Sequence, residues 1–221
     1  MEPPASLQSG QIRDRKVDVL KSIPRISPEK VDHYAVRGQY GRGKVNGLKV
    51  NGYRQEEGIA HDSNTETFVA IKFYLDNERW EDVPFYVRTG KKMKEKHSYI
   101  TIHFKPLPNS TFSESTSLLS ANRLVINIQP QMDIRLQFMS KKPGLSLALK
   151  PVEMIFDNFA CQTDTPEAYE TLLLEALVGD LTLFMRSDQV EEAWEVIKTI
   201  QETWEKTKDP SFPNYASGNW G

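Results

Sequence analysis

Apolar and polar residues alternate along several short segments in the middle of the chain. Residues 65–77 (TETFVAIKFYLDN) show this period of two most clearly, with one face formed by Thr67, Val69, Ile71, Phe73 and Leu75 and the other by Phe68, Ala70, Lys72 and Tyr74. A period of two predicts a β-strand, because successive side chains of a strand point to opposite faces of a sheet. Similar segments, each bounded by Pro, Gly, Asn or Asp, predict further strands at 31–40, 85–88, 98–105, 123–129, 134–140 and 147–157.

The spacing of apolar residues becomes helical towards both ends of the chain. Residues 11–23 repeat apolar positions at helical intervals and stop before Pro24, which predicts a short amphipathic helix. A second helix is predicted over 166–178, with Thr165 as the N-cap and Gly179 as the terminating residue.

A third helix is predicted over 188–206. Asp188 and Glu191 resemble a capping box at its start. One apolar stripe runs along it, formed by Val190, Ala193, Trp194, Ile197, Ile200 and Trp204. Because such a stripe must be buried, we expect the second and third helices to pack against the sheet.

The order of these elements predicts the fold class. Successive strands joined by short turns favour an antiparallel meander, and strands followed by helices are typical of α+β domains. We therefore predict an α+β fold, with a large, mostly antiparallel β-sheet and helices packed on one face. A length of 221 residues suits one domain, predicted here over residues 1–221.

The composition of the chain limits which binding partners and which cellular location are expected. A formal net charge of -2 provides no positive field that would attract nucleic acid or an anionic membrane. The one cysteine, Cys161, cannot form an internal disulfide, and no Cys and His spacing suggests a metal site. With neither a signal-peptide pattern nor an apolar run of membrane-spanning length, the chain is expected to be cytoplasmic.

The densest cluster of charge is a run of lysines followed by a histidine: Lys91, Lys92, Lys94, Lys96 and His97. Ammonium groups can bind a phosphate or hydrogen-bond sugar hydroxyls, but charge runs more often form a solvated loop, so the pattern alone favours the loop. The four histidines are candidate general bases because they titrate near neutral pH, although histidines are more often structural; they are His33, His61, His97 and His103.

The glycines of residues 38–43 (GQYGRG) do not form a dinucleotide-binding fingerprint. That fingerprint needs a helix directly after the glycines, so that the helix N-terminus faces the pyrophosphate. No helical period follows residue 43, and further glycines and asparagines predict turns.

Several strings of the sequence together resemble the C-terminal domain of glucose-6-phosphate dehydrogenase. They are MEPP (1–4), IRDRKVDVL (12–20), VRGQY (36–40), TETF (65–68), Trp80, DVPFYVRTGK (82–91), LVINIQP (124–130), PEAYETLL (166–173) and the stretch 179–194. The resemblance covers essentially the whole chain, and 83–91 is its most specific part.

The resemblance implies that the nucleotide-binding half of such an enzyme is missing. In that family an N-terminal Rossmann domain for NADP, a DHYLGK segment and a catalytic histidine all precede the MEPP string, with which this chain begins. Asp32, His33 and Tyr34 are followed by Ala35 and Val36 rather than Leu, Gly and Lys, so we interpret them as strand residues without a catalytic role. The resemblance thus implies no catalytic residue in this chain.

Three residues are expected by resemblance to contact glucose 6-phosphate: the lysine of RTGK, the basic residue five positions later and the glutamine of IQP, which are Lys91, Lys96 and Gln129. Some relatives also bind a second, structural NADP. Arg88 matches one basic contact of that site, whereas His97, Thr101 and Asn127 stand where arginine or lysine is expected, so we expect no structural NADP.

The resemblance also implies the role of the parent enzyme. It oxidises D-glucose 6-phosphate to 6-phospho-D-glucono-1,5-lactone with NADP+ in the pentose phosphate pathway, and this chain alone is expected to be inactive. Partners would be the missing N-terminal domain and further copies of the chain, in a homodimer or tetramer formed through the sheet. The alternative is a standalone, non-catalytic domain that assembles with or regulates a dehydrogenase.

Overall fold

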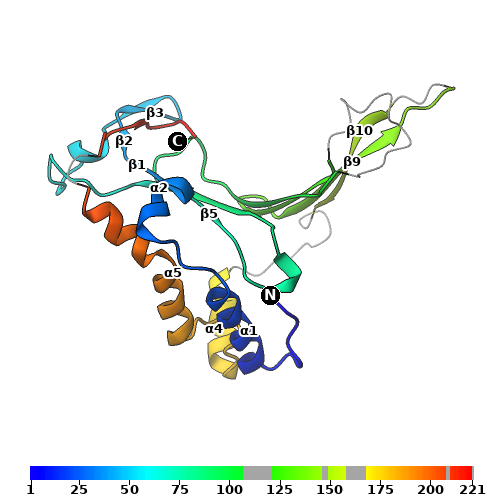
Figure 1. The fold of residues 1–221 in the computed structure, drawn as a ribbon. Helices are drawn as coiled ribbons and strands as arrows, with labels where there is room; N and C mark the ends of the chain where they lie inside the picture. The colour runs from blue at the N-terminus through cyan, green and yellow to red at the C-terminus, as the bar shows by residue number, and fades with distance from the viewer. Residues whose placement is uncertain (107–120, 146–148, 158–167, 208–209, 221) are drawn as a thin grey trace. The chain divides into compact units, whose positions relative to one another are not determined.

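The computed structural model describes residues 1–106, 121–145, 149–157, 168–207 and 210–220 (Figure 1). The predicted N-cap Thr165 and the single Cys161 lie outside the described residues. The chain forms two compact units, one made of Met1–Glu95 with Glu167–Gly221 and the other of Lys96–Pro166. Compactness alone does not define domains, so the single domain over residues 1–221 stays a prediction.

The first unit is built on a three-stranded antiparallel sheet in the order β1-β5-β6. Its strands are β1 (Ala35–Gly38), β5 (Phe68–Phe73) and β6 (Phe85–Gly90). Strand β5 is shorter than the predicted 65–77, but its faces are as predicted: Ile71 is buried, and Val69 and Phe73 pack beside it.

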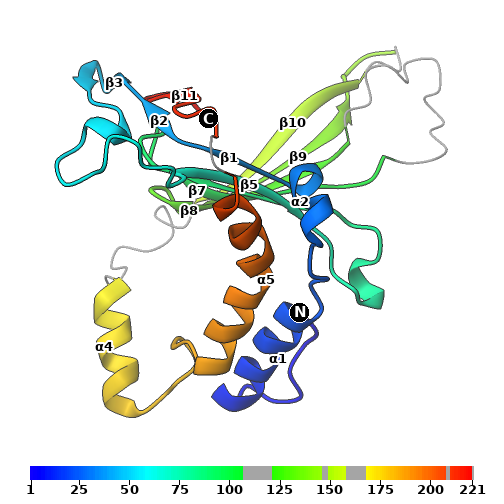
Figure 2. The same ribbon diagram turned by 60° about the vertical axis from the view of Figure 1, so that its left-hand side comes forward.

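Helix α5 (Ser187–Glu205) supplies the core that covers this sheet. Ile200 is 1% exposed and forms one cluster with Val31, Ala35, Ile71 and Trp204. Helix α1 (Ser9–Lys21) lies beside α5 (Figure 2), and an ion pair of 2.7 Å between Asp14 Oδ1 and Arg186 Nη1 joins α1 to the start of α5.

The remaining elements of the first unit are short except for one helix. They are η1 (Pro28–Lys30), α2 (Val31–Tyr34), β2 (Tyr40–Gly41), β3 (Gly43–Val45), β4 (Leu48–Val50), η2 (Tyr53–Gln55), η3 (Glu78–Trp80), α4 (Ala168–Val178) and β11 (Tyr215–Ala216). Strands β3 and β4 form a hairpin, whereas β2 and β11 form a parallel pair.

The predicted strand over 31–40 is wrong in its first part. Val31–Tyr34 forms the helical turn α2, and the strand begins only at Ala35. Pro28 starts a 3-10 turn directly before α2, where its fixed φ suits a helical conformation. The turn places Val31, with no exposed surface, in the core under α5, and this burial outweighs its preference for a strand.

The two C-terminal helices depart from the predictions at several residues. The helix begins at Ser187, so the N-cap of α5 is Arg186 rather than Asp188. The Asp188 carboxylate accepts hydrogen bonds from the Arg186 guanidinium and from Gln189 N. Trp194 of the predicted stripe is 57% exposed. Helix α4 ends before Gly179 as predicted, with φ of 77°, but Leu177 is 86% exposed, so α4 does not pack its apolar side chains on the sheet as expected.

The second unit is a four-stranded antiparallel sheet in the order β10-β9-β8-β7. Its strands are β7 (Ser98–His103), β8 (Arg123–Gln129), β9 (Asp133–Lys141) and β10 (Leu149–Asp157). All four were predicted to within a few residues, and the sequential pairing confirms the predicted meander. The α+β class is confirmed, although the described strands fall into four sheets rather than one.

The register of the second unit separates polar from apolar side chains. Asn127 faces Asp133, whereas Ile126 faces Ile134, and Ile134 in turn faces Phe156. Since side chains alternate along each strand, one face of the sheet is rich in polar residues and the opposite face is apolar.

Candidate functional site

The lysine run begins where β6 ends, in a tight turn over Lys91–Lys94. The last residue of the strand, Gly90, has no space for a side chain, because a Cβ atom there would lie 2.9 Å from the Phe68 ring and 2.8 Å from Met93 Sδ. Lys91 N donates a hydrogen bond of 2.7 Å to Thr67 O, which ties the start of the turn to the residue before β5.

The three lysines of this turn have different environments. The Lys92 ammonium lies 3.7 Å from a Glu56 carboxylate oxygen, and Lys94 Nζ lies 5.9 Å from the centre of the Trp220 ring. Lys91 is exposed, and its ammonium has no hydrogen bond or ion pair within the described part of the chain. Lys91, the lysine of this turn that the family resemblance implies in substrate binding, is thus the one without a partner among the described residues.

Lys96 and Gln129 belong to the second unit, so the structure does not place them relative to Lys91. Gln129 ends β8 opposite Ser98, and Lys96 lies two residues before Ser98. Both side chains are exposed, and neither has a polar partner among the described residues. The second unit thus presents a cation and an amide near the same end of the β7–β8 pair.

A chain of hydrogen bonds crosses the polar face beside these two residues. His97 Nε2 lies 3.1 Å from Asn127 Oδ1, Asn127 Nδ2 donates to Asp133 Oδ1, and Arg135 Nη2 donates to Asp133 Oδ2 at 2.8 Å. Since the Asn127 amide nitrogen faces the carboxylate, its oxygen accepts from His97 and Nε2 carries the proton. The hydrogen bonds from Arg135 and then from Asn127 lower the pKa of Asp133.

Arg88, the weak candidate for a structural NADP contact, is covered by an aromatic ring. Its guanidinium carbon lies 5.7 Å from the centre of the Trp220 ring, within the usual range of a cation–π contact. In the second unit, Asn127 donates a hydrogen bond to the Asp133 carboxylate and accepts one from His97. The carboxylate is itself paired with Arg135, so this network holds no unpaired cation for a phosphate.

The glycine-rich segment 38–43 is confirmed not to lead into a helix. It forms β2 and the start of β3, and the C-terminal strand β11 pairs with β2. A Cβ atom on Gly43 would lie 2.1 Å from Ser217 O, so glycine is needed for the close approach of the two segments.

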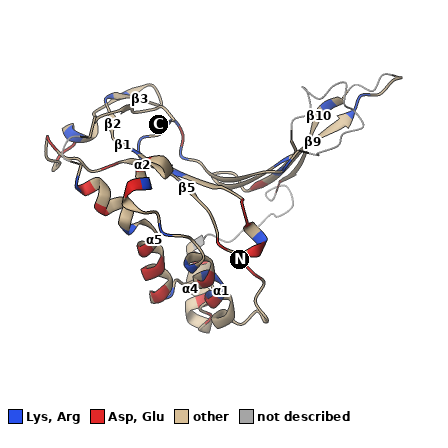
Figure 3. Cartoon of the chain, viewed as in Figure 1, with Lys and Arg blue, Asp and Glu red and all other residues tan. Residues whose placement is uncertain are grey.

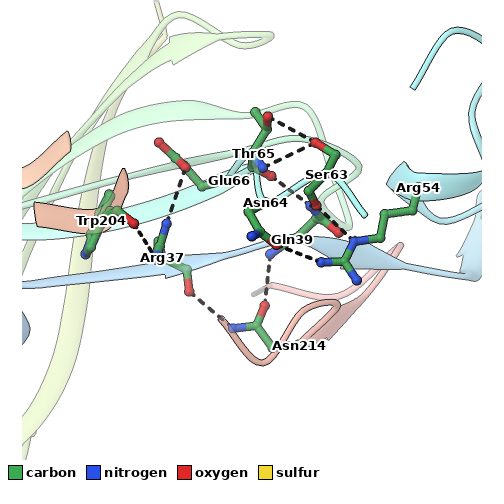
Figure 4. Close-up of polar contacts among 9 residues, drawn as sticks. All are labelled: Arg37, Gln39, Arg54, Ser63, Asn64, Thr65, Glu66, Trp204 and Asn214. Carbon is green, nitrogen blue, oxygen red and sulfur yellow. Dashed lines mark hydrogen bonds and ion pairs between the residues drawn. The ribbon is translucent and has the colours of Figure 1, made fainter. Parts of the chain in front are cut away.

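A buried amide network, unrecognised in the sequence, joins these segments (Figure 4). The Gln39 side chain has no exposed surface, and its Nε2 donates to Ser63 O and Thr65 O, both at 2.9 Å. Its backbone N donates to Asn214 Oδ1 at 2.9 Å, and Asn214 Nδ2 donates to Arg37 O at 3.2 Å. Gln39 is a polar residue directly after a glycine in a strand pattern, and this is the signal that could have indicated the network.

The other three candidate histidines lie outside the series of hydrogen bonds that joins His97, Asn127 and Asp133. His33 is exposed on α2, with its ring 4.9 Å from that of Tyr34, and so it is not a strand residue as interpreted from the sequence. His61 Nδ1 lies 3.1 Å from Arg54 O, and His103 ends β7. Among the described residues, no group of three or more His, Cys, Asp or Glu side chains could hold a metal ion.

Acidic side chains are concentrated on one helix of the first unit. Figure 3 shows acidic residues along α5, which carries six carboxylates but one lysine: Asp188, Glu191, Glu192, Glu195, Glu202 and Glu205 against Lys198. Within the described ranges, no helix has the length and apolar character needed to cross a membrane.

Comparison with known proteins places the whole chain in one family. The family described as "Glucose-6-phosphate dehydrogenase, C-terminal domain" matches residues 1–221. The chain belongs to this family. The resemblance carried by its sequence strings is confirmed.

Two curated relatives are similar along the entire chain. Glucose-6-phosphate 1-dehydrogenase of Bacillus subtilis (strain 168) is 44% identical over 222 residues, which cover 100% of this chain and 45% of that protein. The enzyme of the same name from Dickeya dadantii (strain 3937) is 43% identical over 225 residues, which cover 100% of this chain and 46% of that protein. The chain therefore spans about half the length of these curated relatives.

Solved structures of the family share the fold. One, described as "Glucose-6-phosphate dehydrogenase in complex with its substrate glucose-6-phosphate", superposes with a TM-score of 0.87 at 33% identity and covers 100% of this chain and 44% of that one. Glucose-6-phosphate 1-dehydrogenase from Mycobacterium avium gives a TM-score of 0.78 at 29% identity, with 100% and 43% covered.

The chain of hydrogen bonds on the polar face predicts a dependence of stability on pH. In Asp133→Asn the carboxylate is lost, so the variant should unfold at a lower temperature than the natural chain at pH 7. Because the pKa of Asp133 is lowered in the folded state, its contribution is complete above the ordinary value of 3.8 and is lost as pH falls through the lowered pKa. Circular dichroism melting curves at several pH values should show the difference shrinking below that value.

The matched control is Asp62→Asn, which removes an exposed carboxylate from the first unit. It should change the melting temperature little at any pH. A difference between Asp133→Asn and the natural chain that stayed constant from neutral to acidic pH would contradict the prediction.

Proposed function

We propose that this chain is the C-terminal domain of a full-length glucose-6-phosphate dehydrogenase and supplies part of its contacts to glucose 6-phosphate. One observation carries the proposal: the entire chain superposes on a dehydrogenase described as bound to that substrate, with a TM-score of 0.87. The curated relatives, about twice as long, bear the name of the same enzyme.

Three exposed polar groups would contact the sugar phosphate. The ammonium groups of Lys91 and Lys96 would make charge-assisted hydrogen bonds, and the Gln129 amide can donate to and accept from sugar hydroxyls. Their lack of polar partners among the described residues supports this role, since binding breaks no existing contact. Held in this way, C1 of the sugar is presented for oxidation at a lower entropic cost.

The full-length enzyme would oxidise the C1 hydroxyl of glucose 6-phosphate with NADP+ and release 6-phospho-D-glucono-1,5-lactone, in the oxidative pentose phosphate pathway. The described residues do not fit a cradle for this cofactor, because the glycines of 38–43 lie in paired strands instead of preceding a helix. We assign both the cofactor site and the base to the remainder of the full-length enzyme. A cytoplasmic location suits a chain with one cysteine.

A second, structural NADP is not part of the proposal. Arg88 is stacked against Trp220, and the polar face of the second unit presents an anionic Asp133 where His97 and Asn127 replace the expected basic residues. Because Arg135 is paired with Asp133 at 2.8 Å, this polar network offers a phosphate no unpaired cation.

The apolar face of the second unit supports assembly into a homodimer or tetramer. Large apolar side chains there are exposed in the single chain, among them Ile100 at 50%, Ile134 at 42%, Met154 at 62% and Phe156 at 55%. Monomeric proteins rarely expose such a continuous apolar surface, and a closed, two-fold pairing of copies would bury it.

Replacing Lys91 tests the substrate contact. In the full-length enzyme, Lys91→Met should raise KM for glucose 6-phosphate roughly tenfold to a hundredfold, the worth of a hydrogen bond to a charged group, and leave KM for NADP+ unchanged. Initial rates of NADPH formation measure both constants. Lys49→Met, which removes an exposed lysine on β4, is the control and should match the natural enzyme. An unchanged KM in Lys91→Met contradicts the assignment.

The 221-residue chain on its own should form no NADPH from glucose 6-phosphate and NADP+, because the base and the cofactor cradle lie in the remainder of the enzyme. The absorbance of NADPH measures this directly, with the full-length enzyme as the positive control. Turnover by the isolated chain would overturn the division of roles. A gene that encodes these residues alone, with a product that binds a separate dehydrogenase, would support the standalone domain instead.

Assembly is tested by placing a charge on the apolar face. Light scattering of the 221-residue chain should give about twice the mass of one copy, and Ile134→Glu should give a monomer because a buried, unpaired carboxylate opposes pairing. Leu48→Glu, at a residue that is 72% exposed on β4, is the control and should stay dimeric. A natural chain that is monomeric at all accessible concentrations would count against the proposed interface.

A further inference from the structure

The C-terminal segment Asn214–Trp220 runs directly over the turn that carries Lys91, and both belong to the first unit. Tyr215 Oη donates a hydrogen bond of 2.9 Å to Lys91 O. Gly218 N donates to Lys92 O at 2.8 Å, and Lys94 N donates to Asn219 O at 3.0 Å. Three successive contacts thus connect the end of the chain to the backbone of the lysine turn.

The Tyr215 hydroxyl lies within a directed series of hydrogen bonds. Tyr40 N donates to Thr67 Oγ1 at 3.0 Å, and Thr67 Oγ1 lies 2.9 Å from Tyr215 Oη. Since Thr67 Oγ1 accepts from Tyr40, its own proton is available for Tyr215. The Tyr215 proton has two carbonyl acceptors, Thr67 O at 3.2 Å and Lys91 O at 2.9 Å, and the contact to Lys91 O is the shorter. Burial raises the pKa of Tyr215, so the hydroxyl keeps that proton at neutral pH.

The segment is itself held in place from the opposite side. β11 pairs with β2, and Asn214 bridges Arg37 and Gln39 on the strand side (Figure 4). Gly218 has φ of 88°, and a Cβ atom there would lie 1.9 Å from Lys44 O. The segment is therefore held by contacts that do not involve the lysine turn.

The turn depends on these contacts because its own conformation is unfavourable. Lys92 adopts a positive φ of 49°, which is uncommon for a residue with a side chain. In addition to the three contacts from the C-terminal segment, Lys91 N is bonded to Thr67 O. Hydrogen bonds to the backbone on both sides of Lys92 compensate for this conformation.

We infer that the C-terminal segment positions Lys91 for substrate, with the Tyr215 hydroxyl as the positioning group. The inference rests on the proposed function, in which the Lys91 ammonium contacts glucose 6-phosphate. A lysine side chain has four flexible carbons, so its ammonium reaches a defined point only when its backbone is fixed. Tyr215 acts through the carbonyl of Lys91 and is therefore a positioning residue.

Tyr215→Phe removes the hydroxyl and keeps the ring against Tyr40 and Phe68. In the full-length enzyme, KM for glucose 6-phosphate should rise about two- to tenfold, the usual worth of one neutral hydrogen bond, with KM for NADP+ unchanged. Tyr53→Phe, whose ring also packs on Tyr40, is the matched control and should not change either constant. Thermal melting shows whether both variants are folded.

The pair Tyr215→Phe and Lys91→Met shows whether Tyr215 acts through Lys91. If it does, adding Tyr215→Phe to Lys91→Met should raise KM no further, whereas independent effects would multiply. In the 221-residue chain, Tyr215→Phe should also speed hydrogen exchange at the Lys91, Lys94 and Gly218 amides about two- to tenfold.

The outcomes separate this inference from the proposed function. If Lys91→Met leaves KM unchanged, the substrate contact itself fails. If Lys91→Met raises KM but Tyr215→Phe does not, or if the two effects multiply, the contact stands and the positioning role of Tyr215 is wrong. Faster exchange without a change in KM gives Tyr215 a structural role and likewise overturns the inference.

Discussion

The parallel pairing of β2 with β11 is the constraint on which the first unit depends. Tyr40 pairs with Tyr215, 175 residues later in the sequence. Gly41 leaves room for the Pro213 ring, and Gly43 leaves room for the backbone of Ser217. Closing such a long loop is entropically costly, and a two-residue ladder alone cannot offset it. The buried Gln39 amide, the Asn214 bridge and the Ser217 hydroxyl bonded to Gly41 O supply further hydrogen bonds that stabilise the closure.

Local periodicity predicted the strands well where each strand pairs with its neighbour in sequence. β8 was predicted residue for residue, and β9 and β10 to within two residues at their described ends, because one apolar face sets both the strand and its register. The predictions were wrong where contacts between residues far apart in the sequence determine the local conformation. Val31–Tyr34 forms a helical turn because Val31 fits beneath Ile200, and Asp188 is drawn away from a capping role by Arg186, which also pairs with Asp14.

The candidate site was predictable to a smaller extent. A run of lysines is most often a solvated loop, so Lys91 could not be distinguished from Lys92 or Lys94 by pattern, and the family resemblance supplied that choice. The structure adds a physical difference, since Lys92 faces Glu56 and Lys94 faces Trp220, while Lys91 remains free among the described residues. Tyr215 could not have been found from sequence, because its relation to Lys91 exists only after β11 has paired with β2.

The two units hold their cationic side chains in different ways. In the first unit, both backbone polar groups of Lys91 are hydrogen-bonded, so the free energy of ordering this backbone is contributed on folding. In the second, Arg135 is neutralised by Asp133, and that carboxylate in turn holds Asn127 and His97. The basic residues of this polar network are thereby paired, whereas Lys96 remains without a partner among the described residues. The substrate contact that we propose thus uses lysines without polar partners in the described part of the chain.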